Sequence, residues 1–272
     1  MPASTEALLV NSNLGQAMSF YAGANLEARL HNLSGVLAVF CGRNYPVFNV
    51  ALLNGFREGH LKQELFAASQ YYRSLHCGFT FWLCEDLIEP RLLSEIKTTI
   101  FPERGFFDLS DPPGMLLRGA PAPARGLPAI EFKPVNDAAS RSTFCHLTTH
   151  IFDIPFGMSN AMYGAQQGWT DEYEAWLGYV NGQPVTLAFI VFSAGAAGLY
   201  SVGTLAPFRK QGFGEATVRW CIARASESRG SKNFVLQSSD IGLSLYRRLG
   251  FQKVTKFTVF KFKDKQDLGP QY

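Results

Sequence analysis

Residues 128–263 show two alternating hydrophobic patterns, which together predict an α/β fold. Short apolar stretches, typical of strands, cover residues 128–135, 197–205, 233–237 and 255–262. Longer stretches with helical spacing cover residues 137–152, 214–230 and 240–250. Asn181-Gly182 lies between two apolar runs and predicts a β-hairpin over residues 172–193. Strands that alternate with helices in this way predict an α/β fold with a mixed sheet.

The first half of the chain repeats this order of elements more faintly. Strands are predicted at residues 47–53, 78–84 and 114–119, with helices at residues 61–75 and 90–104. Gly105-Phe106 then corresponds to Gly250-Phe251, which also follows a predicted helix. The repeated order predicts an internal duplication, although the halves share little sequence.

A stretch that is poor in core-forming residues separates the two halves. Residues 118–129 contain four alanines, three prolines and two glycines, which is typical of a linker. We therefore predict a first domain at residues 1–119, a linker at residues 120–126 and a second domain at residues 127–272.

The composition narrows the class of protein. The 272 residues are 47% hydrophobic and include 23 phenylalanines, which excludes a disordered chain. The five cysteines form no CxxC pair, so we expect buried free thiols in a reducing compartment rather than disulfides or a zinc site. The longest strongly apolar run, residues 185–192, is too short to cross a membrane, and no signal peptide is visible. These features predict a soluble cytoplasmic protein.

The net charge of +3 is unevenly distributed along the chain. From Ser201 onward there are 13 Lys and Arg residues against 5 Asp and Glu, whereas residues 127–200 hold 2 against 6. A basic final third suits a polyanionic ligand, and it also fits an ordinary solvated surface. No helix-turn-helix, zinc-finger or RRM signature is present, so nucleic acid is not an expected partner.

The stretch RKQGFGE, residues 209–215, joins a predicted strand to a predicted helix. The start of a helix presents unpaired N–H groups and positive potential, which suit a phosphate. Gly212 and Gly214 leave room for the phosphate, and Arg209 adds positive charge. A tight turn that contains glycine is the alternative interpretation. Neither the GxxxxGK[ST] loop nor the GxGxxG fingerprint is present.

A second motif lies one strand and one helix further along the chain. In SSDIGLSLYRRLGF, residues 238–251, Ser239 or Asp240 is placed to cap a helix that carries Tyr246. RxxGxG followed at this separation by LYxxxGF resembles the GNAT superfamily of acyl-CoA-dependent N-acyltransferases. The resemblance covers residues 128–263. The first half of the chain resembles the degenerate first domain of tandem-GNAT proteins, which implies a GNAT-like fold in two domains.

The resemblance implies a role for each matching residue. The strand whose backbone pairs with the pantetheine arm contains Val202, Gly203 and Thr204. The pyrophosphate loop consists of Arg209, Lys210, Gln211, Gly212, Phe213 and Gly214. Tyr246 matches the tyrosine that is proposed to protonate the leaving thiolate, and a core aromatic is the alternative. Arg247 or Arg248 matches a contact to the 3′-phosphate, and a solvated helix surface is the equal alternative.

The sequence departs from the family pattern at two positions. Ser239 stands where GNAT proteins often carry asparagine, and its hydroxyl can still hydrogen-bond the pantetheine or cap the helix. The strand GLYSVGTL carries no carboxylate where some GNAT proteins place a general base. Candidates elsewhere are Glu172, Glu174, Asp153 and His150, and no spacing singles one out. His146 and His150 lack a third ligand, so no metal is predicted.

The resemblance implies an acetyl-CoA-dependent N-acetyltransferase that moves the acetyl group directly to a primary amine of a small molecule or peptide. A non-catalytic acyl-CoA-binding sensor is the main alternative, and a purely structural α/β protein is a third. The expected partners are acetyl-CoA and an amine acceptor, with no metal, nucleic acid or membrane. The acceptor is not identified, although its specificity is expected within residues 144–179. A homodimer is left open. One working cofactor site is predicted, in the second half.

Overall fold

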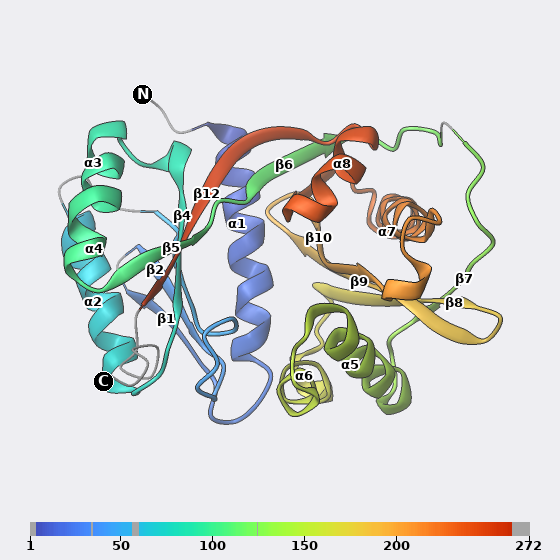
Figure 1. The fold of residues 1–272 in the computed structure, drawn as a ribbon, viewed down its shortest axis with the longest axis horizontal. Helices are drawn as coiled ribbons and strands as arrows, with labels where there is room; N and C mark the ends of the chain where they lie inside the picture. Colours follow the sequence, from blue (N-terminus) through green and yellow to red (C-terminus); the bar gives the residue numbers. More distant parts are fainter. Residues whose placement is uncertain (1–3, 34, 56–59, 124, 263–272) are drawn as a thin grey trace, which may run out of the picture.

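A computed structural model describes residues 4–33, 35–55, 60–123 and 125–262. The described strands form one 12-stranded mixed sheet with the order β1-β2-β3-β4-β12-β6-β11-β10-β9-β8-β7, and β5 also pairs with β12. Helices cover both faces of the sheet, and α1 runs across the middle of the molecule between the two halves (Figure 1).

The first half contains six strands. They are β1 (Arg29–Leu33), β2 (Val36–Phe40), β3 (Val50–Leu53), β4 (Thr80–Cys84), β5 (Phe106–Ser110) and β6 (Pro113–Arg118). The helical segments are α1 (Thr5–Ser19), η1 (Phe20–Ala22), α2 (Leu61–Ser74), η2 (Glu85–Leu87), α3 (Pro90–Glu95), the π-helical η3 (Ile96–Ile100) and α4 (Phe101–Glu103). The strands and helices predicted in this half are therefore present.

The second half contains the other six strands. They are β7 (Glu131–Pro134), β8 (Tyr173–Val180), β9 (Gln183–Ser193), β10 (Ala196–Thr204), β11 (Asn233–Gln237) and β12 (Gln252–Phe262). The helical segments are α5 (Ala138–Phe152), α6 (Phe156–Tyr163), η4 (Gln166–Gly168), η5 (Ala206–Phe208), α7 (Phe213–Arg229) and α8 (Asp240–Arg248). The predicted hairpin turns at Asn181 and Gly182, where both residues have positive φ, as a type I′ turn requires.

The two halves share the same internal order, as the repeated pattern predicts. In the first half, β3 runs parallel to β4 with α2 between them, and in the second, β10 runs parallel to β11 with α7 between them. Gly105 and Gly250, which the repeat aligns, have φ values of 82° and 93° and end the helix before the next strand. The loop after β3 includes residues 56–59, which lie outside the described part. The prediction of a single working cofactor site, in the second half, stays a prediction.

Strands β6 and β12 cross between the halves. β6 precedes the linker, yet it pairs antiparallel with β11 of the second half. β12 pairs with β6 through Gln252–Lys256 and then with β4 of the first half through Phe257–Lys261. The two halves therefore build one continuous sheet (Figure 1). The division into domains at residues 119 and 127 stays a prediction.

The core of the second half follows the alternation of side chains along β9. Leu187, Phe189 and Val191 pack with α5 and α6 on one face of the sheet. Ala188 and Ile190 pack with α7 on the opposite face. From Val185 to Val191 the strand is apolar except for Thr186, because both of its faces are buried there.

Helix α1 is fastened to the second half by a buried asparagine. The side-chain amide of Asn13 donates to the carbonyl groups of Val191, Ser193 and Ala196 at 3.1–3.2 Å. Its oxygen accepts from the Tyr200 hydroxyl at 2.8 Å. A Cβ atom at Gly198 would lie 1.9 Å from that oxygen, so the strand needs glycine where the helix crosses it. The first helix of the chain is thus part of the second half's core.

The five cysteines are free and buried, as predicted. No helix of the described residues is long and apolar enough to cross a membrane. Over the same residues, no group of three or more His, Cys, Asp or Glu side chains could hold a metal ion.

Candidate functional site

The site begins where β10 and β11 diverge. Their parallel pairing is limited to Ala197 opposite Phe234 and Gly198 opposite Val235. Beyond Gly198, β10 stays paired with β9 as far as Thr204, and β11 stays paired with β6. Over the described residues, the edge of β10 that faces β11 therefore has no strand partner from residue 199 to residue 204. Backbone groups on this edge are available to a ligand.

A bulge lies within the unpaired part of β10. The register with β9 shifts between Tyr200 and Gly203, and Ser201 has a φ of 46°. A residue with a side chain is strained in this conformation, which is typical of bulges near functional sites. The Ser201 hydroxyl lies 3.4 Å from that of Tyr163, which in turn lies 3.4 Å from that of Tyr21. Burial raises the pKa of both tyrosines, so they are neutral hydroxyl groups at neutral pH.

The loop after β10 folds into a cradle of backbone N–H groups. Lys210 and Gly212 have positive φ values of 60° and 92°, and α7 begins directly after them. In the first turn, Ala216 donates its N–H to the Gly212 carbonyl at 3.0 Å. Within the described chain, no backbone carbonyl accepts from the N–H groups of residues 211–215. The loop therefore offers consecutive donors at the positive end of a 17-residue helix.

Side chains of the loop are oriented by local hydrogen bonds. Arg209 donates its Nε–H to the Thr204 carbonyl at 3.0 Å, which links the loop to the end of β10. Gln211 donates its side-chain amide to the Pro207 carbonyl at 2.8 Å. Phe213 is buried, whereas Arg209 and Lys210 are exposed. The buried Phe213 side chain thus holds the loop in place, and the cationic side chains of Arg209 and Lys210 are accessible to solvent.

Gly214 lies where three elements meet. A Cβ atom at this position would lie 3.6 Å from Thr204 Oγ1 on β10 and 3.7 Å from Leu245 Cδ2 on α8. The structure therefore brings together the end of β10, the start of α7 and the helix that carries Tyr246. These are the elements on which the sequence motifs were found.

Tyr246 is held by α8 with its ring in the core. It is 8% exposed, and its ring packs against that of Phe251 at a centroid distance of 5.6 Å. Burial and the nearby Cys221 raise the pKa of its hydroxyl, so Tyr246 stays protonated at neutral pH. A Cβ atom at Gly242 would lie 2.9 Å from the Tyr246 ring, so the helix needs a small residue there.

Of the two predicted caps, Ser239 caps α8, because its Oγ accepts from the Gly242 N–H at 3.4 Å. Its role toward a cofactor stays a prediction. Arg247 and Arg248 are both exposed on the helix, and Arg248 donates to the Ser244 carbonyl at 3.2 Å.

The predicted base candidates are dispersed. Glu174 lies 4.0 Å from Arg224 on the α7 side of the sheet. Glu172 and Asp153 are exposed, and His150 is exposed on α5. None of them hydrogen-bonds Ser201, whose hydroxyl lies near that of Tyr163. Sequence reasoning missed the hydroxyl chain of Tyr21, Tyr163 and Ser201, because it joins segments that are distant in the sequence.

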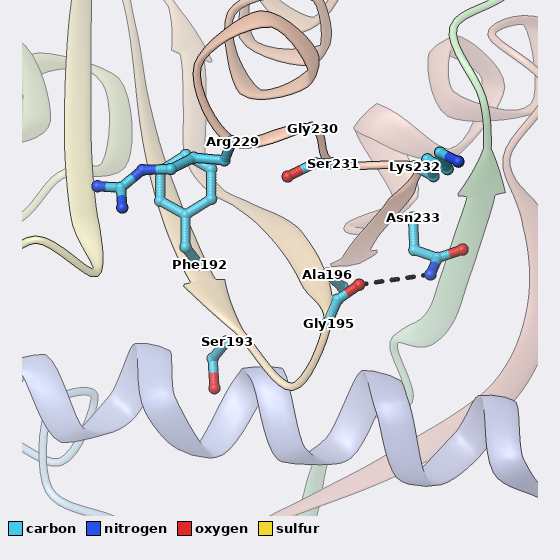
Figure 2. A pocket seen from close by; sticks show the side chains of 9 residues that line it. All are labelled: Phe192, Ser193, Gly195, Ala196, Arg229, Gly230, Ser231, Lys232 and Asn233. Atoms are coloured by element: carbon cyan, nitrogen blue, oxygen red, sulfur yellow. Dashed lines mark hydrogen bonds between the residues drawn. The ribbon is translucent and has the colours of Figure 1, made fainter.

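The structure has a pocket at each end of the β10–β11 pair. One, of about 510 Å³, lies at the start of β10, where Arg229 covers the Phe192 ring and Asn233 hydrogen-bonds the Gly195 carbonyl (Figure 2). It contains none of the predicted site residues. The other, also about 510 Å³, lies at the carboxyl end of β11 and includes Ser239. It is lined by Trp82 and Asp111 from the first half and Asp240 from the second, so both halves contribute.

The chain was compared with known proteins. No protein-family model matches it, and no curated protein does. Among solved structures, a GCN5-related N-acetyltransferase from Kribbella flavida is similar, with a TM-score of 0.69 and 18% identity over 93% of this chain and 96% of that one. A GCN5-related N-acetyltransferase from Sphaerobacter thermophilus has a TM-score of 0.59 and 16% identity, over 84% and 76% of the two chains.

A tandem GNAT protein from the clavulanic acid biosynthesis pathway is similar over the whole length. Its TM-score is 0.58 with 11% identity, and the match covers 96% of each chain. These likenesses show the fold. The chain has a mixed α/β GNAT acyltransferase fold, and the likeness to a tandem protein extends over both halves.

Proposed function

We propose that this protein is an acetyl-CoA-dependent N-acetyltransferase that acts on a primary amine. The observation that carries the proposal is the joint arrangement of the diverging strands and the N-terminal cradle of α7. An unpaired strand edge that leads into unpaired N–H groups matches a ligand with an amide-containing arm and a pyrophosphate. The fold agrees with this function.

Each part of the substrate has a proposed partner. The backbone of Val202, Gly203 and Thr204 would pair with the amides of the pantetheine arm. The N–H groups of Gln211, Gly212, Phe213 and Gly214 would hold the pyrophosphate, with charge from Arg209 and Lys210. Ser239 would hydrogen-bond the arm, and Arg247 would reach the 3′-phosphate.

The proposed reaction is direct transfer. The neutral amine attacks the thioester carbonyl carbon, the N–C bond forms, and the C–S bond breaks. The nitrogen loses a proton to water, and the thiolate receives one from Tyr246, so CoA leaves as the thiol. The Tyr246 phenolate then regains a proton from water. The raised pKa of Tyr246 means that it holds this proton at neutral pH. Positioning of the two substrates supplies most of the rate enhancement.

We propose that the acceptor amine binds in the pocket beside Ser239, which lies outside residues 144–179, where the sequence predicted its specificity. This pocket adjoins the carboxyl end of β11, where the strands diverge. Its walls carry two carboxylates, Asp111 and Asp240, together with the Trp82 ring. Asp111 is already paired with Lys256 at 2.9 Å, which leaves Asp240 as the more available anion. These walls suit a cationic amine that carries an apolar group.

A second candidate function is an acyl-CoA sensor without catalysis. It is supported by the base candidates, none of which hydrogen-bonds Ser201 at the bulge. A panel of primary amines, assayed for acetyl-CoA-dependent release of free CoA thiol, separates the two. The transferase predicts turnover with at least one amine, whereas a sensor binds acetyl-CoA and releases thiol with none.

A further inference from the structure

The segment between the halves is fastened to the first turn of α7. Arg125 of this segment lies 2.9 Å from Glu215, measured from Nη2 to Oε2. Arg219, one turn further along α7, lies 3.1 Å from the other carboxylate oxygen of Glu215. Arg219 also donates to the Pro121 carbonyl at 2.6 Å. The predicted linker is therefore attached to the helix at two points.

The same segment runs directly beside the N–H cradle. A Cβ atom at Gly212 would lie 3.1 Å from Cδ of Pro128. Pro128 follows Arg125 by three residues, so the segment passes from Glu215 to the loop that precedes the helix. The chain that continues from the linker thus packs against the loop at Gly212, beside the proposed pyrophosphate site.

Glu215 is a buried carboxylate that pairs with two arginines. This carboxylate is 8% exposed and lies in the first turn of α7, where its negative charge would repel a bound phosphate. Burial raises its pKa, but hydrogen bonds from Arg219 and Arg125 outweigh burial and lower it, so the group is ionised. Arg219, 14% exposed, already neutralises it within the helix. A second arginine adds net positive charge at this point.

Arg125 has hydrogen-bonding capacity to spare. A guanidinium group carries five N–H donors, and Arg125 uses one of them on Glu215. Its side chain is 59% exposed, so the remaining donors can reach a ligand. Contact with Glu215 fixes the guanidinium group beside the helix terminus. Less side-chain entropy is then lost when a ligand binds.

We propose that Arg125, supplied by the linker and positioned by Glu215, binds a phosphate group of CoA. The proposal rests on the proposed function, because it concerns the same cofactor site. It assigns the linker a part in binding the substrate as well as in joining the halves.

The test is the affinity of the full-length chain for CoA, measured by titration calorimetry at low salt. Arg125→Ala should weaken binding about ten- to a hundred-fold, the range expected for charge-assisted hydrogen bonds. Arg118→Ala is the matched control, since this exposed arginine at the other end of the segment pairs with Glu6 and should leave affinity unchanged. Thermal melting of each variant checks that it is folded.

A double variant separates contact from charge compensation. If Arg125 only neutralised Glu215, Arg125→Ala/Glu215→Gln would regain wild-type affinity for CoA. If Arg125 binds a phosphate group, the double variant would still bind CoA weakly. Repeating the titrations with 3′-dephospho-CoA identifies the phosphate: loss of the Arg125 effect indicates the 3′-phosphate, and its persistence indicates the pyrophosphate. Wild-type affinity for CoA in Arg125→Ala, or in the double variant, would overturn the role of Arg125 but leave the proposed function standing. Failure of the wild-type chain to bind CoA overturns the proposed function and the inference with it.

Discussion

At Gly212, both the backbone conformation of the loop and the proposed pyrophosphate favour glycine. Its φ of 92° lies in the region that favours glycine, and the adjacent N–H groups form the cradle. Gly230 ends the same helix with a φ of 63° and has no atom within 4 Å of a built Cβ. The two glycines therefore share backbone strain but differ in their distance from the proposed ligand.

We expect Gly212→Glu to abolish CoA binding, because a carboxylate would enter the pyrophosphate site. Gly230→Glu also places a side chain at a positive φ, at the opposite end of α7 and without the contact to Pro128, and should bind CoA as the wild type does. Calorimetric titration of both variants checks this. Equal loss of affinity in the two would mean that strain, and not the ligand site, is responsible.

Tyr246→Phe is expected to lower kcat about 100-fold, because it removes the proposed proton donor but keeps the ring. The KM for acetyl-CoA and the melting temperature should change little, since the ring packing against Phe251 is kept. Steady-state kinetics check this. An unchanged kcat would rule out the role of general acid.

At the scale of elements, α1 is one of the parts of the fold that sequence reasoning did not predict, together with β1, β2, β5 and α6. Its buried positions include Asn11, Asn13 and Gly15, which a hydrophobic pattern counts as polar or helix-breaking. Their burial is explained only by long-range contacts, such as those of Asn13 with the β9–β10 hairpin. Apart from α6, the strands, helices and hairpin turn of the second half were predicted because their signals are local.

Asn13→Leu should destabilise the protein by roughly 2–4 kcal/mol, because buried carbonyl groups lose their donor. Ser12→Ala, on the same helix and only partly buried, is the control and should change stability by less than about 0.5 kcal/mol. Urea unfolding measures both free energies. Similar values for the two variants would show that Asn13 does not fasten α1.

At the scale of the whole molecule, the exchanged strands tie the halves together. Lys256 on β12 lies 2.9 Å from Asp111 and 3.4 Å from Glu85, and Lys97 lies 2.9 Å from Glu85. No local pattern in GMLLRG or TKFTVFKF reveals a partner in the opposite half, so the exchange could not be predicted from the sequence. For the same reason, the sequence pointed to the phosphate loop and Tyr246 but not to the linker beside them.

The strand exchange predicts that the full chain unfolds in one cooperative transition. Residues 127–272 alone would lack β6 and α1, and would expose the apolar edge of β11. We therefore expect this fragment to be insoluble or to lack a cooperative transition in thermal melting. A fragment that folds alone with a sharp transition would show that the second half is independent.

The ion-pair network should make stability depend on pH. Burial raises the pKa of Glu85 and Asp111, but hydrogen bonds from Thr258, Lys97 and Lys256 outweigh it and lower both. These acids stabilise the fold above their unfolded pKa values, and that stability is lost as pH falls through the folded ones. The hydrogen bond that Lys256 donates to Asp111 raises the pKa of Lys256, whose contribution is lost at strongly alkaline pH. Urea unfolding across pH should show a weaker acid-induced loss in Lys256→Met than in the wild type; identical slopes would contradict the network's role.

Titration of the full chain with acetyl-CoA by calorimetry tests the proposed function most directly. We expect micromolar affinity and one site per chain, with binding abolished by Gly212→Glu and retained in Gly230→Glu. A folded wild-type protein that takes up no acetyl-CoA, or one that binds it equally well in Gly212→Glu, would contradict the proposed function.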